Sequence, residues 1–94
     1  MEQWAALHVM VYGMVQAVNF RTFVLRNAKA LGLTGYVRNI SREHAVEVVA
    51  EGDREKLEQL LGQVEVGPRF ASVKRVEVDW SEYSGTYRNF RIGS

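Results

Sequence analysis

Apolar residues recur along this chain with two different periods. Every second residue from Leu7 to Val11 is apolar, which predicts a strand with one buried face. Apolar positions three and four residues apart instead predict two helices, one from Phe20 to Leu31 and one across Leu57 to Val64. Asn19 and Asp53 precede these stretches and are the expected N-caps.

Four further stretches predict the remaining strands. Tyr36 to Ile40, Ala45 to Glu51 and Val76 to Trp80 are rich in β-branched and aromatic residues, and Phe90 to Ile92 predicts a short last strand. Val73 falls out of the alternation that runs from Val76 to Trp80. We therefore expect a β-bulge or a late strand start at that point.

The order of these elements is strand, helix, strand, strand, helix, strand, followed by the terminal strand. Strand–helix–strand units make right-handed crossovers, and two interleaved units give one antiparallel sheet with both helices on one face. The pattern predicts an α+β, ferredoxin-like βαββαβ sandwich with a short extra C-terminal strand, formed by residues 1–94 as a single domain. This fold supports many functions, so it does not settle function by itself.

Composition narrows the function classes. The chain has 94 residues, of which 47% are apolar, and a formal net charge of +1, which argues against a dedicated nucleic-acid binder. The absence of cysteine excludes a disulfide framework, a thiolate metal site and a cysteine nucleophile. The N-terminal residues lack a signal-peptide pattern, and no apolar run approaches the roughly 18 residues of a membrane span. We expect a cytoplasmic monomer that binds neither nucleic acid nor membranes.

The most informative segment runs from Gly13 to Arg21, where the first predicted strand leads into the first predicted helix. The first turn of a helix has N–H groups without intrahelical partners and carries a partial positive charge. Arg21 stands where an acidic residue would be favoured, at a cost of roughly 0.3–1 kcal/mol by the dipole rule. An anion held between Arg21 and the loop amides would offset this cost.

Two blocks carry a resemblance to a known family. The first reads Gly-x-Val-Gln-x-Val-x-Phe-Arg from Gly13 to Arg21, and the second reads Gly-Tyr-Val-Arg-Asn from Gly35 to Asn39. Their order and separation resemble those of the acylphosphatases, and the resemblance extends from about Leu7 to Ile92. It implies hydrolysis of acyl phosphates to carboxylate and inorganic phosphate, without a metal or organic cofactor.

The same resemblance implies the roles of individual residues. Arg21 would hold the anionic end of the substrate, and Asn39 would position the attacking water. A phosphate-binding loop would be formed by Met14, Val15, Gln16, Ala17, Val18, Asn19 and Phe20.

The residue chemistry is compatible with this reaction. Transfer of a phosphoryl dianion through a loose transition state depends mainly on positioning and charge stabilisation. Asn39 is neutral and cannot act as a general base, so we expect the oxygens of the substrate to take the proton. The expected pH–rate profile is flat near neutrality, whereas a sharp dependence near pH 6.5 would implicate His8 or His44.

The chain departs from the family pattern at several positions. Ala17 stands where glycine is usual, and a positive φ there would add roughly 1–2 kcal/mol of strain. Met14 replaces a basic residue, and the turn from Ser41 to His44 lacks the expected glycine. We expect Gln16 to stabilise the loop through its side-chain amide, and Arg38 to lie as a solvated charge on the open face of the sheet.

Three other functions were weighed. An anion-binding module of the same fold without turnover is the main alternative, because of Ala17. An RNA-binding domain of this topology needs aromatic residues on its third strand, but Ala45 to Glu51 has none. A metal site is disfavoured because His8 and His44 lie on separate predicted elements without ligand spacing.

Overall fold

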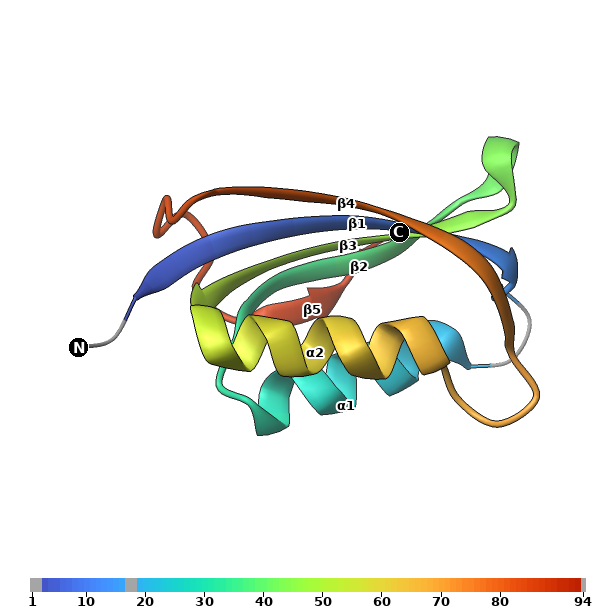
Figure 1. Ribbon diagram of the computed structural model, residues 1–94, viewed down its shortest axis with the longest axis horizontal. Helices are drawn as coiled ribbons and strands as arrows, with labels where there is room; N and C mark the ends of the chain where they lie inside the picture. Colours follow the sequence, from blue (N-terminus) through green and yellow to red (C-terminus); the bar gives the residue numbers. More distant parts are fainter. Residues whose placement is uncertain (1–2, 17–18, 94) are drawn as a thin grey trace.

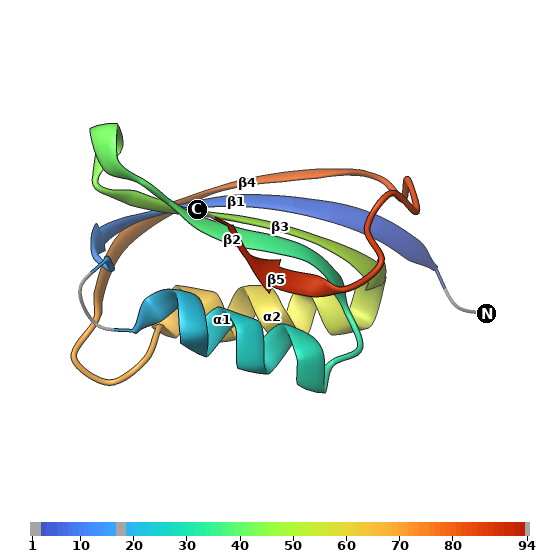
Figure 2. The same cartoon turned by 180° about the vertical axis from the view of Figure 1, so that it is seen from behind.

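The protein folds into one sheet covered on one face by two helices (Figures 1 and 2). The computed structural model describes residues 3–16 and 19–93. The strand order is β4-β1-β3-β2-β5, and the predicted ferredoxin-like α+β fold is confirmed. The elements in chain order are β1 (Trp4–Met14), α1 (Phe20–Ala30), β2 (Thr34–Ile40), the 3₁₀ turn η1 (Ser41–Glu43), β3 (Ala45–Asp53), α2 (Arg54–Val66), β4 (Ser72–Glu82) and β5 (Phe90–Ile92).

The sheet is mixed, because the short C-terminal strand, for which the sequence predicted no direction, runs parallel to its neighbour. β1, β2, β3 and β4 pair antiparallel with their neighbours, whereas β5 runs parallel to β2, with Gly35 opposite Phe90. β4 ends at the same end of the sheet at which β2 begins. The chain crosses this end of the sheet after β4, and β5 then starts beside the start of β2. The buried carboxylate of Glu51 holds this crossing, accepting hydrogen bonds from Ser84 Oγ at 2.7 Å and from the Gly85 amide at 3.0 Å.

The core lies between the sheet and the two helices. Side chains alternate along a strand, so Leu7, Val9 and Val11 of β1 point to the same face as their register partners Ala50, Val48 and Val46 of β3. The helices contribute the row of buried apolar side chains that the spacing of their apolar residues predicts. The Asp53 side chain caps α2 by accepting a hydrogen bond from the Glu55 amide at 3.1 Å. Among the fully buried side chains are Leu7, Val9, Val11, Phe20, Val24, Val46, Val48, Leu57, Leu60 and Val64.

A bulge joins β1 to β4 just before the Gly13 segment. Tyr12 pairs with Arg75 and Gly13 pairs with Val73, which leaves Lys74 as the extra residue. This confirms the irregularity expected from the position of Val73. Gly13 has φ +133°, and a Cβ added there would overlap the Ser72 carbonyl oxygen. The glycine at the start of the motif therefore allows β4 to approach β1 closely.

Candidate active site

Arg21 lies in the first turn of α1, which contains no acidic residue. The first helical hydrogen bond is donated by the Phe23 amide to the Asn19 carbonyl at 3.0 Å. The preceding amides, those of residues 20–22, therefore have no partner within the helix. Together with the guanidinium of Arg21 they present only donors and positive charge.

A cavity of about 260 Å³ lies beside this helix end. Arg21 lines it and is partly exposed. Within residues 3–16 and 19–93, Arg21 makes no ion pair and no side-chain hydrogen bond, so no carboxylate described there neutralises its charge. The other lining residues are Gln16, Asn19, Phe20, Thr22 and Ile92.

Asn39 lies near the carboxyl end of β2, at the same end of the molecule as the start of α1 (Figures 1 and 2). It shares a sheet face with Val37, whose register partner Ile92 lines the cavity of Arg21. Asn39 itself is not part of the cavity lining. Its Oδ1 atom is buried and has no hydrogen-bond partner among the described residues, which leaves a buried acceptor available at this end of β2.

Gln16 connects the loop to the neighbouring strand ends. Its Nε2 atom donates to the Ala45 carbonyl at 2.9 Å and to the Ile40 carbonyl at 3.3 Å. These two carbonyls flank η1 at the ends of β2 and β3. The side-chain amide therefore has the structural role expected from the sequence, because it ties the loop after β1 to the strand that carries Asn39.

The described part of the loop is held by two apolar side chains. Val15 and Phe20 are buried in the core, whereas Met14 is 67% exposed and Asn19 is exposed. Ala17 and Val18, and with them the question of strain at Ala17, lie outside the described residues. The loop thus leaves β1 and enters α1 at anchored positions.

Asn19 occupies the N-cap position but does not cap α1 with its side chain, which corrects the prediction. Its backbone is left-handed, with φ 60° and ψ 30°, and its side chain makes no capping hydrogen bond. A capping side chain requires an extended backbone at the N-cap, whereas asparagine also tolerates the left-handed region. The first-turn amides are consequently not satisfied by Asn19.

Arg38 is exposed on the open face of the sheet, as predicted, but it is not a simple solvated charge. Its Nε atom donates to Glu47 Oε1 at 2.6 Å, and His8 Nε2 hydrogen bonds to Glu47 Oε2 at 2.7 Å. Burial raises the pKa of Glu47, but the hydrogen bonds from His8 and Arg38 outweigh it and lower that pKa overall. This cluster lies on the face opposite the helices and away from Arg21.

The described residues offer no metal centre. No group of three or more His, Asp or Glu side chains among them could hold a metal ion. His8 is engaged with Glu47, and His44 is exposed after η1 with φ 51°. Neither helix of the described chain is long and apolar enough to span a membrane.

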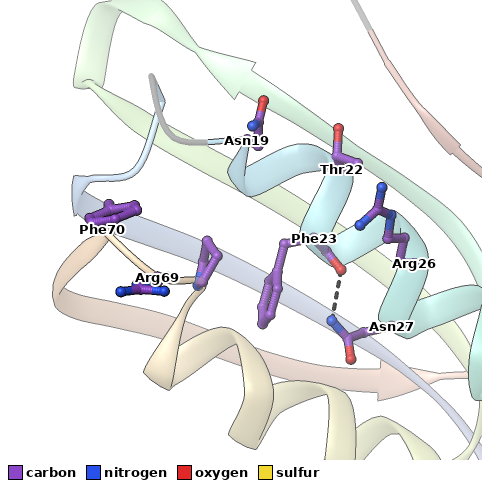
Figure 3. Close-up of a pocket in the computed structure, with 8 residues that line it drawn as sticks. Asn19, Thr22, Phe23, Arg26, Asn27, Arg69 and Phe70 are labelled. Carbon is purple, nitrogen blue, oxygen red and sulfur yellow. Dashed lines mark hydrogen bonds between the residues drawn. The ribbon is translucent and has the colours of Figure 1, made fainter.

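A second pocket has a volume of about 720 Å³ (Figure 3), and it shares Asn19 and Thr22 with the lining of the Arg21 cavity. The sequence pattern does not predict this pocket, because its two sides come from α1 and from the segment between α2 and β4, far apart in the chain. The adjacent basic and aromatic residues at 69 and 70 are the only signal in the sequence. Its lining includes Asn19, Thr22, Phe23, Arg26, Arg69 and Phe70.

The fold defines an α+β domain, and its first helix begins with an arginine that has no ion-pair partner among the described residues. Comparisons with known proteins identify the family. A family model described as Acylphosphatase matches residues 7–92. An acylphosphatase of Caldanaerobacter subterraneus subsp. tengcongensis is 44% identical over 86 residues, covering 92% of this chain and 94% of the relative.

Solved structures agree with the sequence comparisons. An acylphosphatase from Bacillus subtilis matches with a TM-score of 0.90 at 31% identity, over 96% of this chain and 99% of that chain. An acylphosphatase from Coxiella burnetii matches with a TM-score of 0.89 at 37% identity, over 96% and 93% of the two chains. The chain therefore belongs to the acylphosphatase family, a family of acid-anhydride hydrolases. The resemblance carried by the two sequence blocks is confirmed.

Proposed function

We propose that this chain hydrolyses the carboxyl–phosphate bond of acyl phosphates, with Arg21 and the loop amides holding the phosphoryl group. The observation that carries this assignment is the guanidinium of Arg21. It lies in the first turn of α1, it lines a cavity, and it has no carboxylate partner among the described residues. A phosphoryl dianion supplies the charge that this arrangement lacks, and the planar guanidinium suits bidentate binding of its oxygens.

Asn39 is proposed to position the attacking water. Its buried Oδ1 atom can accept a hydrogen bond from that water. The water oxygen then bonds to phosphorus while the bond between phosphorus and the acyl oxygen breaks. The carboxylate leaves, and the protons of the water end on the released phosphate and solvent. No side chain has to act as a base, so the contribution of Asn39 is positioning.

Substitution of the two residues tests this assignment with benzoyl phosphate as the substrate. We expect Arg21→Gln to lower kcat/KM by about 10²–10³-fold, as is typical for loss of one donor to a developing charge. Arg21→Lys restores the charge but not the bidentate geometry, and we expect only partial recovery. Asn39→Ala should lower kcat by about 100-fold with little change in KM, because it misplaces the water without removing the phosphate contacts.

Arg88→Gln is the matched control. Arg88 is exposed in the segment between β4 and β5, which meets the sheet at the opposite end, where the Asn89 carbonyl accepts from the Gly35 amide. This variant should keep the parental kcat and KM. Wild-type turnover in both Arg21→Gln and Asn39→Ala would contradict the proposed roles.

A second candidate function is anion binding without turnover. It is favoured by Ala17, which stands where the family usually has glycine. Titration with inorganic phosphate, together with the hydrolysis assay, separates the two functions. Phosphate binding that depends on Arg21, with no release of benzoate from benzoyl phosphate, would replace the enzymatic proposal with this one.

We also propose that the enzyme works as a monomer in the cytoplasm. A single chain carries Arg21, Asn39 and the loop, so the proposed site needs no second copy. Light scattering coupled to size exclusion should give the mass of one chain, and a mass of two chains would contradict this part of the proposal.

A further inference from the structure

The large pocket beside α1 borders the cavity of Arg21. Asn19 and Thr22 line both spaces, so the two spaces are adjacent along α1. Arg26 lies one helical turn beyond Thr22, and the rise from Arg21 to Arg26 is about 7.5 Å along the axis. The pocket is therefore located where the acyl part of a substrate would extend if its phosphoryl group were held at Arg21.

The lining of this pocket carries two positive charges and no carboxylate. Arg26 comes from α1 and Arg69 from the segment before β4, and in the view of Figure 3 they lie on either side of the Phe23 ring. Neither guanidinium makes an ion pair with any residue in the described ranges. Asn27 is engaged elsewhere, since its Nδ2 atom donates to the Phe23 carbonyl at 2.8 Å.

Phe70 is the second unusual feature of this pocket. Its side chain is 79% exposed, and its backbone adopts φ 74°, a conformation that aromatic residues rarely occupy. The ring lies 5.2 Å from the Arg69 guanidinium carbon. The positive φ belongs to a β-turn closed by the Ala71 amide, which donates to the Pro68 carbonyl at 3.1 Å, and this turn keeps the exposed Phe70 side chain in the lining of the pocket.

We infer that Arg26, Arg69 and Phe70 form a subsite for the acyl group, selecting acyl phosphates whose acyl part carries a second anionic group. This inference rests on the proposed function of Arg21. The apolar surface of Phe23 and Phe70 accommodates the body of the acyl group, and the two guanidinium groups bind its anionic end. The second anion is bound away from the reacting phosphorus, so these residues determine specificity and take no part in bond breaking.

The inference is tested with two substrates that differ by one charge, benzoyl phosphate and 4-carboxybenzoyl phosphate. The wild-type enzyme should prefer the carboxylated substrate by about three- to tenfold in kcat/KM, through a lower KM, as expected for exposed charge-assisted contacts. High salt should reduce the preference because it screens exposed charges. In Arg26→Gln and Arg69→Gln the preference should fall, and in the double variant it should disappear.

Arg88→Gln again serves as the control and should retain the wild-type preference. Equal kcat/KM for the two substrates in the wild type, or a preference that survives the double substitution, would overturn the subsite while leaving the hydrolase intact. If neither substrate is hydrolysed by the wild-type enzyme, the proposed function itself fails, and the subsite fails with it. The two failures are therefore distinguishable in one set of assays.

Discussion

Arg21 carries its positive charge at a helix end where the macrodipole is also positive. In most helices this combination is unfavourable, and a nearby carboxylate would be expected to relieve it. No described residue does so. At the scale of single residues, the proposed site is therefore a positive charge without a carboxylate partner among the described residues, and we propose that this imbalance gives it affinity for a dianion.

Ala17 is the residue whose substitution tests the efficiency of the loop. If the backbone at this position needs φ > 0, alanine adds roughly 1–2 kcal/mol of strain. We then expect Ala17→Gly to raise kcat/KM for benzoyl phosphate by about tenfold, measured in the hydrolysis assay. If φ is negative there, Ala17→Gly should slightly lower the free energy of unfolding and leave kcat/KM unchanged, which would contradict the strain hypothesis.

Glu47, on the open face of the sheet, should make the free energy of unfolding depend on pH. Burial raises its pKa, but the hydrogen bonds from His8 and Arg38 lower it below the ordinary value of 4.5 in the folded state. A carboxylate with a lowered folded pKa stabilises the protein above its unfolded pKa, and this contribution is lost as the pH falls through the folded value.

The comparison of wild type with Glu47→Gln measures this contribution. The difference in their free energies of unfolding should be constant from neutral pH down to about pH 5, and it should shrink as the pH falls further. Urea unfolding at several pH values gives the two curves. A difference that does not change with pH would show that the ion pairs of Glu47 contribute nothing to the effect.

At the scale of elements, the loop is placed by the bulge between β1 and β4. Gly13 has φ +133° and stands against the backbone of Ser72, so the loop leaves β1 from a position that only glycine fills easily. At its other end, Gln16 ties the loop to the carbonyls at the ends of β2 and β3. Two strand ends therefore fix where the loop lies relative to Asn39.

Gly13→Ala should destabilise the protein by about 1–3 kcal/mol, because a Cβ at this φ is strained and overlaps the Ser72 carbonyl oxygen. The hydrolysis rate should fall as well, since the loop starts at this residue. Chemical denaturation measures the first effect and the benzoyl phosphate assay the second.

Gly62→Ala is the matched control for this substitution. Gly62 lies within α2, and a Cβ there would have no atom within 4 Å. Alanine should stabilise the helix by roughly 0.5–1 kcal/mol. A Gly13→Ala variant as stable as the wild type would show that β4 can shift away from β1 without cost.

At the scale of the whole molecule, the fold brings the proposed site together from segments distant in the chain. The loop after β1 and the end of β2 lie at the end of the sheet where α1 starts (Figure 2), and Ile92 of β5 lines the cavity of Arg21. The opposite end is held by Glu51 and carries the crossing from β4 to β5. Binding at one end should therefore stabilise the molecule without rearranging the other.

Inorganic phosphate, the proposed product, should raise the melting temperature. A ligand that binds only the folded state at ten times its Kd adds about 1.4 kcal/mol, which in a domain of this size corresponds to a rise in Tm of roughly 5–10 °C. Differential scanning calorimetry with sodium phosphate measures the shift, and sodium chloride of equal ionic strength is the reference. The shift should vanish in Arg21→Gln and persist in Arg88→Gln. A shift that persists in Arg21→Gln would place the phosphate elsewhere.

Much of the fold could be predicted from local pattern. A strand or a helix buries side chains at a fixed spacing, so the apolar residues show where these elements lie. Examples are the alternation from Leu7 to Val11, the helical spacing from Leu57 to Val64 and the interrupted alternation at Val73. The direction of β5 could not be predicted, because the pattern of a three-residue strand is the same for a parallel and an antiparallel neighbour. It depends on the edge of the sheet to which the chain crosses after Glu82.

The candidate site, like the fold, was predicted in part. Arg21 and Asn39 were identified as site candidates by sequence motifs, and their roles remain predictions. The prediction that the Asn19 side chain caps α1 was wrong, because capping preference describes asparagine in general and not the path of this loop.

The sequence by itself determined the elements, the buried faces and the family of this protein, because periodicity and short motifs are local properties of the chain. Only the tertiary structure decided which distant residues share a space. It placed Ile92 and Arg21 in one cavity lining, Glu47 between His8 and Arg38, and Arg69 in the same pocket lining as Arg26. These neighbours follow from strand order and from packing of the helices, which depend on the free energy of the whole fold and not on any single segment.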